Sequence, residues 1–421
     1  MTRREFSFGA AAFVAAQTKA GLRAAAFRAD VTPALGEPLI WVDPAREVLD
    51  PLLAKGLVLE SASLRYVLCT VDWCGLGGYV HDRFRTALAD AVRGEVQGVV
   101  VHAVHQHTAP YAEGGGYQVM VREGDPPLIL SGRFVEVVTW RVAEAARQAL
   151  AALRPIDAIG FGVSQPERVA SARRLMVDGK LVTRFSSGAK DPALAALPEG
   201  DIDSRLRTVT LLSEGRPVAR LHHYSCHPQT FCCTGQVSAD FVGAAREAIE
   251  KDEGVPQLYF TGCAGDITVG KYNDGSEPAR RALATRLAAG MRASIAATTA
   301  EPLHHFDWSV APLRLPAVRT PAQDRYRQAI RTAFAARANP LSAIGVTLGP
   351  AQWVHLPGEP MLDFQRHAPH ALIAGYGDIS PGYLCPDRAF IEGGYEPSAA
   401  NAGKGTEAIV KRAIDRLVAR A

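Results

Sequence analysis

Two histidines at the end of an apolar segment are well placed to bind a metal ion. The run Val99-Val-Val-His-Ala-Val104 leads into His105-Gln106-His107, and Thr108-Ala-Pro110 then predicts a turn. His105 and His107 stand two residues apart, so their side chains leave the same face of an extended chain. This spacing can direct two imidazoles at one cation. The alternative interpretation is a pair of solvated histidines at the end of a strand.

A third histidine follows another apolar run. The segment 217–224 predicts a strand that leads to His227, and Pro228 stops further strand pairing. A histidine fixed before a proline turn can serve as a metal ligand. We interpret its neighbours His222 and His223 as structural residues of the strand.

Two glycine-containing turns carry further polar candidates. Gly262-Cys-Ala-Gly265 leads to Asp266 and Thr268, and glycine lets backbone N–H groups approach a ligand closely. A tight strand-to-helix connection would use the same residues. Glu359 stands in a Pro-Gly-Glu-Pro turn, which holds one carboxylate in place, although a glutamate in a turn often serves solubility alone.

The segment 375–397 is dense in glycine and tyrosine and includes Tyr383 and Tyr395. Segments of this kind commonly line or cover a site. Together with the histidines and the glutamate they make a borderline-hard set of N and O ligands, which suits Zn²⁺ with one open position. The set lacks the paired carboxylates of a calcium cage, and the sequence has neither a P-loop nor a GxSxG elbow.

Composition and hydrophobic patterning indicate the fold class. The 421 residues are 48% hydrophobic and 21% charged, which is typical of globular domains. Strand and helix patterns alternate, with some consecutive strands, so we expect an α/β protein with mixed β-sheets flanked by helices in a single catalytic domain. The segments expected to be helical are 80–92, 133–153, 241–251, 277–297, 321–338 and 406–421.

The net charge and the length of the apolar runs limit the classes of partner that we expect. The formal net charge is only +3 and no Lys/Arg cluster is interleaved with aromatic residues, so we expect no nucleic-acid partner. No apolar run approaches the ~18 residues of a transmembrane segment. These features leave the oligomeric state open.

The N-terminus and the cysteines bear on the compartment. Arg3-Arg4 before the mild apolar run 9–16 resembles a twin-arginine export signal, so we expect residues 1–20 to lie outside a 21–421 domain and the protein to be periplasmic or secreted. The seven cysteines form no CxxC pairs. Three of them, Cys226, Cys232 and Cys233, flank His227. The sequence leaves three interpretations of these residues open: a thiolate metal site, a Cys226–Cys232 disulfide, or small buried side chains.

Taken in order along the chain, these motifs resemble the neutral/alkaline non-lysosomal ceramidases. The resemblance runs from Phe27-Arg-Ala-Asp-Val-Thr-Pro33 to Tyr395-Glu-Pro, and is to the catalytic N-terminal domain of a short, bacterial-type member. His105-Gln-His107-Thr-Ala-Pro is similar to the family's His-Thr-His-Ser-Gly-Pro, and Gly265-Asp-Ile-Thr268 to its Gly-Asp-Val-Ser. The resemblance also covers His227-Pro-Gln-Thr and Leu356-Pro-Gly-Glu359.

The resemblance implies roles for individual residues. The zinc ligands would be His105, His227, Glu359 and Tyr383. A dication beside a phenol lowers its pKa and favours phenolate, so a tyrosine ligand is physically reasonable. The residues implied to act on the substrate are His107, Tyr395, Thr268 and Arg173, with Arg174 as an alternative to Arg173.

The implied activity is a zinc-dependent amidohydrolase. It would cleave the N-acyl amide of a ceramide-like lipid by metal-activated water, giving a fatty acid and an amine. Thr268 stands where the family has a serine, and it keeps the hydroxyl. The sequence has no obvious apolar insertion that would bind a sphingolipid or a membrane. The zinc chemistry is therefore better supported than the ceramide substrate. The alternatives are hydrolysis of another small-molecule or lipid N-acyl amide or ester, and metal or ligand binding without turnover.

Overall fold

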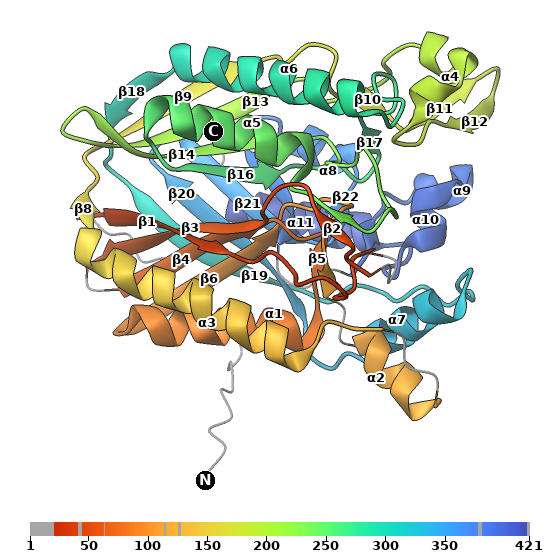
Figure 1. Cartoon of the computed structure of the whole chain (residues 1–421), viewed down its shortest axis with the longest axis horizontal. Helices are drawn as coiled ribbons and strands as arrows, with labels where there is room; N and C mark the ends of the chain where they lie inside the picture. Colours follow the sequence, from red (N-terminus) through yellow and green to blue (C-terminus); the bar gives the residue numbers. More distant parts are fainter. Residues whose placement is uncertain are drawn as a thin grey trace.

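Two β-sheets packed face to face form the centre of the fold in the computed structural model (Figure 1). The structure describes residues 21–40, 44–62, 64–112, 115–124, 128–377 and 381–418. The expected export segment, residues 1–20, lies outside the described residues. Among the described residues, no helix combines the length and the apolar composition that crossing a bilayer requires.

The larger sheet has nine strands within the described residues. In spatial order they are β19 (Phe306–Leu313), β20 (Leu341–Leu348), β21 (Ala351–Pro357), β23 (Leu372–Gly377), β6 (Glu95–Ala103), β4 (Leu64–Val71), β3 (Leu53–Ser61), β1 (Arg23–Asp30) and β8 (Arg154–Pro155). The smaller sheet runs β16 (Gln257–Thr261), β14 (Arg216–Tyr224), β13 (Leu206–Ser213), β9 (Ala158–Ser164) and β18 (Thr299–Pro302). Both sheets mix parallel and antiparallel pairs: β4–β6, β21–β23 and β14–β16 are parallel.

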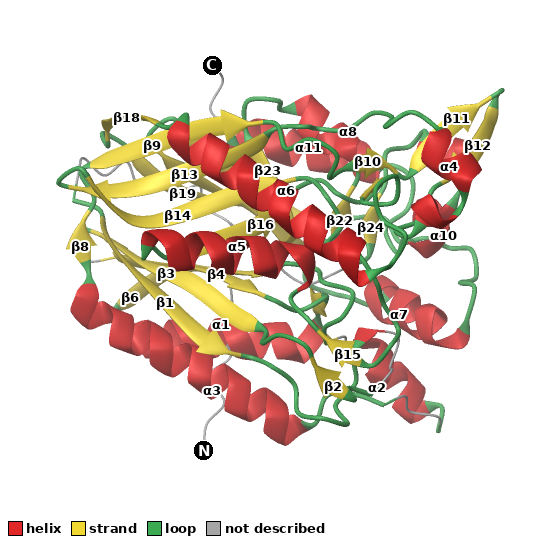
Figure 2. Ribbon diagram, turned by 45° about the horizontal axis from the view of Figure 1, so that its top comes forward, coloured by secondary structure: helices red, strands yellow, loops and turns green. Residues whose placement is uncertain are grey.

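Helices cover the outer faces of the two sheets (Figure 2). Short two-stranded pairs lie between the larger elements: β2 (Glu47–Val48) with β15 (Gln236–Val237), β5 (Gly75–Leu76) with β7 (Tyr111–Ala112), β10 (Ser171–Ala172) with β17 (Ile267–Thr268), β11 (Arg174–Val177) with β12 (Lys180–Thr183), and β22 (Glu359–Pro360) with β24 (Tyr383–Leu384). The helices are α1 (Gly78–Val92), α2 (Gly115–Arg122), α3 (Gly132–Ala149), α4 (Pro192–Ala196), α5 (Asp240–Glu253), α6 (Glu277–Ala296), α7 (Arg325–Ala335), α8 (Leu362–His367), α9 (Ala389–Glu392), α10 (Tyr395–Ala399) and α11 (Thr406–Leu417).

The layers follow from where the apolar side chains lie. α1 buries Val80, Phe84, Leu88 and Val92, four residues apart, against the nine-stranded sheet, beside α3. α5 and α6 cover the five-stranded sheet in the same way, and apolar residues of both sheets meet in one cluster between them. The expected α/β class with mixed sheets in a single domain is confirmed.

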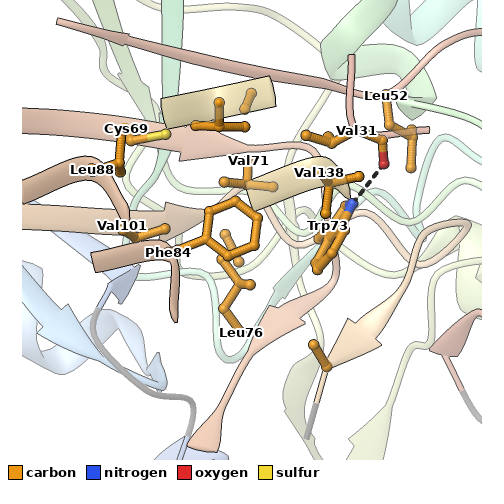
Figure 3. Packing of buried hydrophobic residues seen from close by; sticks show 14 of the residues in the cluster. Val31, Leu52, Cys69, Val71, Trp73, Leu76, Phe84, Leu88, Val101 and Val138 are labelled. Atoms are coloured by element: carbon orange, nitrogen blue, oxygen red, sulfur yellow. Dashed lines mark hydrogen bonds between the residues drawn. The ribbon is translucent and has the colours of Figure 1, made fainter. Parts of the chain in front are cut away.

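One core cluster fixes the start of the site-bearing loops (Figure 3). Trp73 is fully buried, and its indole Nε1 donates to the carbonyl of Val31 at 3.1 Å. Its ring meets Phe84 edge-on at 5.6 Å and stacks on Phe134 at 5.9 Å between centroids. The backbone of Trp73 then accepts from the His105 N–H at 2.9 Å, so core packing holds the histidine segment.

Buried histidines on strands of both sheets make stability depend on pH. Burial lowers the pKa of His355 to about 3, and those of His222 and His223 to about 4. The unfolded chain, with histidine pKa values near 6.5, therefore binds protons first as the pH falls. Stability is full above about pH 6.5 and is lost toward pH 4, by up to about 3 kcal/mol per histidine.

His355→Phe should weaken this acid sensitivity. His355 stacks near Trp353, and neither ring nitrogen has a hydrogen-bond partner among the described residues. We expect the urea midpoint of the variant to fall less than that of the parent between pH 6.5 and 4. His304→Phe, at an exposed position, is the control and should leave the pH profile unchanged. Identical profiles for parent and His355→Phe would contradict the assignment.

Candidate metal centre

The carboxyl ends of five strands lead to one place in the fold. β6 leads to His105, β14 to His227 and β21 to Glu359, while β16 and β23 lead into the glycine-rich segments. Gly377, at the end of β23, pairs with His102 near the end of β6. Residues far apart in the sequence therefore meet at one place.

The backbone at His105 departs from the expected strand. β6 ends at Ala103, and His105 has φ +80°, in the left-handed region that non-glycine residues seldom adopt. The prediction that His105 and His107 share one face of an extended strand is therefore wrong in its geometry. The turn itself brings their Nε2 atoms to 3.2 Å from each other.

Backbone carbonyls determine which nitrogen of each imidazole faces the centre. His105 Nδ1 donates to the carbonyl of Cys74 at 2.5 Å, and His227 Nδ1 donates to that of Ala264 at 2.5 Å. The Nε2 lone pairs are then free to bind a metal. Each Nε2 lies 3.3 Å from Oε2 of Glu359.

This arrangement fits a cation. Two imidazole lone pairs and a carboxylate oxygen repel one another at 3.3 Å unless a positive charge lies between them. Burial alone raises the pKa of the Glu359 carboxyl, but His105 and His227 outweigh it and hold that pKa well below its usual value. The donors N, N and O⁻ are those that zinc prefers. His105, His227 and Glu359 thus fit the expected metal.

Tyr383 lies beside Glu359. β22 and β24 pair in parallel with Glu359 opposite Tyr383, and the Tyr383 side chain is buried. Burial raises the pKa of the phenol, and Arg173 opposes that rise. A phenolate at Tyr383 would therefore depend on a neighbouring cation.

Tyr395 and Arg173 form a layer next to Tyr383. The two phenol rings are 5.8 Å apart, and the Arg173 guanidinium carbon lies 5.3 Å from the Tyr383 ring and 5.4 Å from the Tyr395 ring. Arg173 is buried and donates to Glu396 at 2.7 Å and to the carbonyl of Gly265. It lies behind the tyrosines and is not among the residues that line the pocket.

Of the other residues implied to act on the substrate, His107 lies in the pocket and Thr268 does not. His107 lines the pocket, and burial together with His105 and His227 lowers its pKa, so its imidazole is neutral at pH 7. Thr268 is buried in the β10–β17 pair opposite Ser171 and does not line the pocket. Arg174 bonds to Glu396 and Glu392 at the periphery.

Residues not anticipated from the sequence also belong to the centre. Tyr376 stacks on His105 with ring centroids 4.2 Å apart, and it lies in the glycine- and tyrosine-rich segment already noted. Cys74 Sγ is 3.6 Å from His105 Nδ1. Cys226, Cys232 and Cys233 are not joined in disulfides in the structure, and the clusters of potential ligands among the described residues include none of them.

One pocket opens onto the metal centre, and a second hollow adjoins that pocket. The pocket above it, about 680 Å³ including space open to solvent, is lined by residues of the centre and by one side of α7. An apolar groove of about 500 Å³ continues from it and shares Tyr111 and Tyr326 with it. Its other lining residues are Pro38, Leu39, Tyr79, Val80, Ala112, Tyr117, Leu128, Ile129 and Leu130.

Comparisons with known proteins agree with this architecture. No protein-family model and no curated protein matches the sequence. Among solved structures, one described as "Ceramidase complexed with C2" superposes with a TM-score of 0.71 at 15% identity, covering 96% of this chain and 77% of its own. Neutral ceramidase from Pseudomonas aeruginosa superposes with a TM-score of 0.70 at 15% identity, covering 96% and 76%. The resemblance is confirmed at the level of architecture: the chain has the fold of the neutral ceramidases.

Proposed function

We propose that the protein is a zinc-dependent amidohydrolase that cleaves an N-acyl amide bond of a ceramide-like lipid. The observation that carries the proposal is the convergence of His105 Nε2, His227 Nε2 and the Glu359 carboxylate on one point, with both Nδ1 atoms bonded to carbonyls. The neutral ceramidase fold supports the same reaction class. The apolar groove that adjoins the pocket above the metal centre suits an acyl chain.

The residues around the centre can handle the protons of the reaction. When bound, Zn²⁺ polarises a carbonyl and lowers the pKa of a water toward ~7. The neutral imidazole of His107 can take the proton of the attacking water and return it to the leaving amine. Tyr395, whose phenol keeps its proton because burial raises its pKa, can donate a hydrogen bond to the carbonyl oxygen as negative charge develops there.

Removal of the metal should stop the reaction without unfolding the protein. We expect the purified protein to contain one zinc per chain, to lose hydrolysis of N-acyl substrates on chelation, and to recover it with Zn²⁺ but not with Ca²⁺ or Mg²⁺. Elemental analysis measures the zinc content, and chromatography of the products measures the hydrolysis. Full activity in metal-free protein would rule out the proposal, and zinc binding without hydrolysis would favour a binding-only role.

We propose that the protein is exported, because Arg3-Arg4 precedes a mild apolar run. Cell fractionation of the parent and of an Arg3→Lys/Arg4→Lys variant tests this. The parent should appear outside the cytoplasm, and the variant should stay inside.

A further inference from the structure

Two arginines of α7 face the pocket above the metal centre. Arg327 and Arg331 are four residues apart, so they lie on the same side of the helix, and both line the pocket together with Ile330. Like charges at this spacing destabilise a helix by a few tenths of a kcal/mol. Their shared position on the pocket wall therefore calls for an explanation.

Arg331 is a buried cation that has no carboxylate partner in the part of the chain that the structure describes. It is 4% exposed, and its guanidinium donates to the carbonyls of Thr320 at 2.6 Å, Ser398 at 3.1 Å and Ala400 at 2.9 Å. Among the described residues, its Nε has no hydrogen-bond partner and no carboxylate lies within 4.0 Å. A buried charge without a counter-charge is unfavourable in the free protein.

Other buried arginines show two ways of compensating such a charge. Arg246 pairs with Asp72, and Arg173 with Glu396. Arg184 resembles Arg331, since it bonds only to carbonyls, but it lies away from the pocket. Arg331 differs from all three because it lines the pocket.

Arg327 adds a second positive charge at the rim. Its guanidinium carbon lies 6.0 Å from the Tyr395 ring, and its Nε is 3.5 Å from the half-exposed Asp324 carboxylate. That carboxylate also accepts from the Arg327 N–H as the N-cap of α7. Across the pocket, Glu396 already neutralises Arg173, and Glu359 faces the metal centre. Among the described residues that line the pocket, the two arginines both come from α7, so this wall supplies its guanidinium groups.

We propose that the amide substrate carries an anionic group, a carboxylate or a sulfonate on its amine portion, that binds Arg327 and Arg331. The inference rests on the proposed amidohydrolase function and names its substrate class. The acyl chain occupies the apolar groove, to which α7 contributes Tyr326, and the next residues of the same helix hold the anion. Hydrolysis breaks the C–N bond, adds the water oxygen to the acyl carbon and leaves the amine protonated. A neutral ceramide offers Arg331 no counter-charge.

Matched substrates test the proposal on the zinc-loaded protein. N-octanoylglycine and N-octanoyltaurine are anionic, N-octanoylethanolamine is their neutral counterpart, and a short-chain ceramide is the neutral lipid. We expect kcat/KM for an anionic substrate to exceed that of the neutral counterpart by about tenfold or more, because charge-assisted hydrogen bonds are about twice as strong as neutral ones. Comparing kcat/KM for N-octanoylglycine and N-octanoyltaurine shows whether the site prefers a carboxylate or a sulfonate.

Variants separate charge recognition from structure. Arg327→Gln should raise KM for the anionic substrates about tenfold and leave the neutral ones within about threefold. Arg325→Gln is the matched control, since Arg325 lies on the same helix and pairs with Glu123 outside the pocket. Arg331→Gln could disturb the three carbonyls that Arg331 holds, so Arg331→Lys, which keeps the charge, should retain the preference.

The outcomes distinguish this inference from the proposed function. Equal kcat/KM for anionic and neutral substrates, or a preference unchanged in Arg327→Gln, overturns the anion site while the amidohydrolase stands. If nothing is hydrolysed, the proposed function fails, and titration calorimetry with N-octanoylglycine decides the anion site. Binding weakened about tenfold in Arg327→Gln supports the site, and unchanged binding overturns it.

Discussion

Replacing Glu359 with glutamine is expected to remove zinc and to lower kcat/KM by about 10³-fold or more. The amide keeps the size of the buried side chain but loses the negative charge that His105 and His227 face at 3.3 Å. Without zinc, the transition state loses Lewis-acid stabilisation of several kcal/mol, and each loss of about 1.4 kcal/mol lowers the rate tenfold. Zinc content by elemental analysis and initial rates on an N-acyl substrate measure the two losses together.

The controls separate the metal centre from general damage. His105→Ala should behave like Glu359→Gln, whereas His304→Ala, at an exposed position, should keep both zinc and activity. The circular dichroism of all three variants should match that of the parent. Stoichiometric zinc and full activity in both Glu359→Gln and His105→Ala would show that the metal binds elsewhere.

Replacing Arg246 with methionine is expected to lower the free energy of unfolding by about 3–5 kcal/mol. Arg246 and Asp72 are fully buried and form two hydrogen bonds of 2.9 and 2.7 Å. Removing the arginine leaves the Asp72 charge buried without its partner. Asp72 also accepts from Gln106 at 2.9 Å, so the histidine segment should shift and activity should fall as well. Urea denaturation of the zinc-loaded protein measures the change.

An exposed ion pair provides the comparison. Arg292 on α6 pairs with Asp252 on α5, and their side chains are 53% and 56% exposed, so Arg292→Met should cost less than about 1 kcal/mol. Adding Asp72→Leu to Arg246→Met should recover part of the lost stability, because the buried Asp72 carboxylate that lost its partner is then removed as well. Equal effects of Arg246→Met and Arg292→Met would contradict the role assigned to the buried pair.

The regular elements were largely predictable because they follow local hydrophobic periodicity. α1, α5 and α6 match the helices predicted at 80–92, 241–251 and 277–297 to within a few residues. α3 ends at Ala149, earlier than the predicted end at residue 153. Strands β1, β3, β19 and β23 were not predicted. β3 and β23 are buried along nearly their whole length, so they show little alternation.

The candidate site was predictable where polar residues end apolar runs. His105, His227 and Glu359 converge as expected, and Tyr383 stands beside Glu359. Tyr376, Cys74 and Arg331 were not anticipated, since their roles depend on contacts with residues far away in the sequence. Arg327 and Arg331 share a helical spacing, but spacing alone does not tell which side of a helix faces a pocket.

The sequence by itself determined the α/β class, the residue types of the metal centre and the strand ends that carry them, because periodicity and turn chemistry are local. Only the tertiary structure decided how these residues meet. A left-handed turn at His105 brings its imidazole to that of His107, and backbone carbonyls of Cys74 and Ala264 orient the two ligand histidines. The charge of the pocket wall also depends on the tertiary structure. A buried guanidinium is neutralised only if a carboxylate from elsewhere in the chain lies beside it.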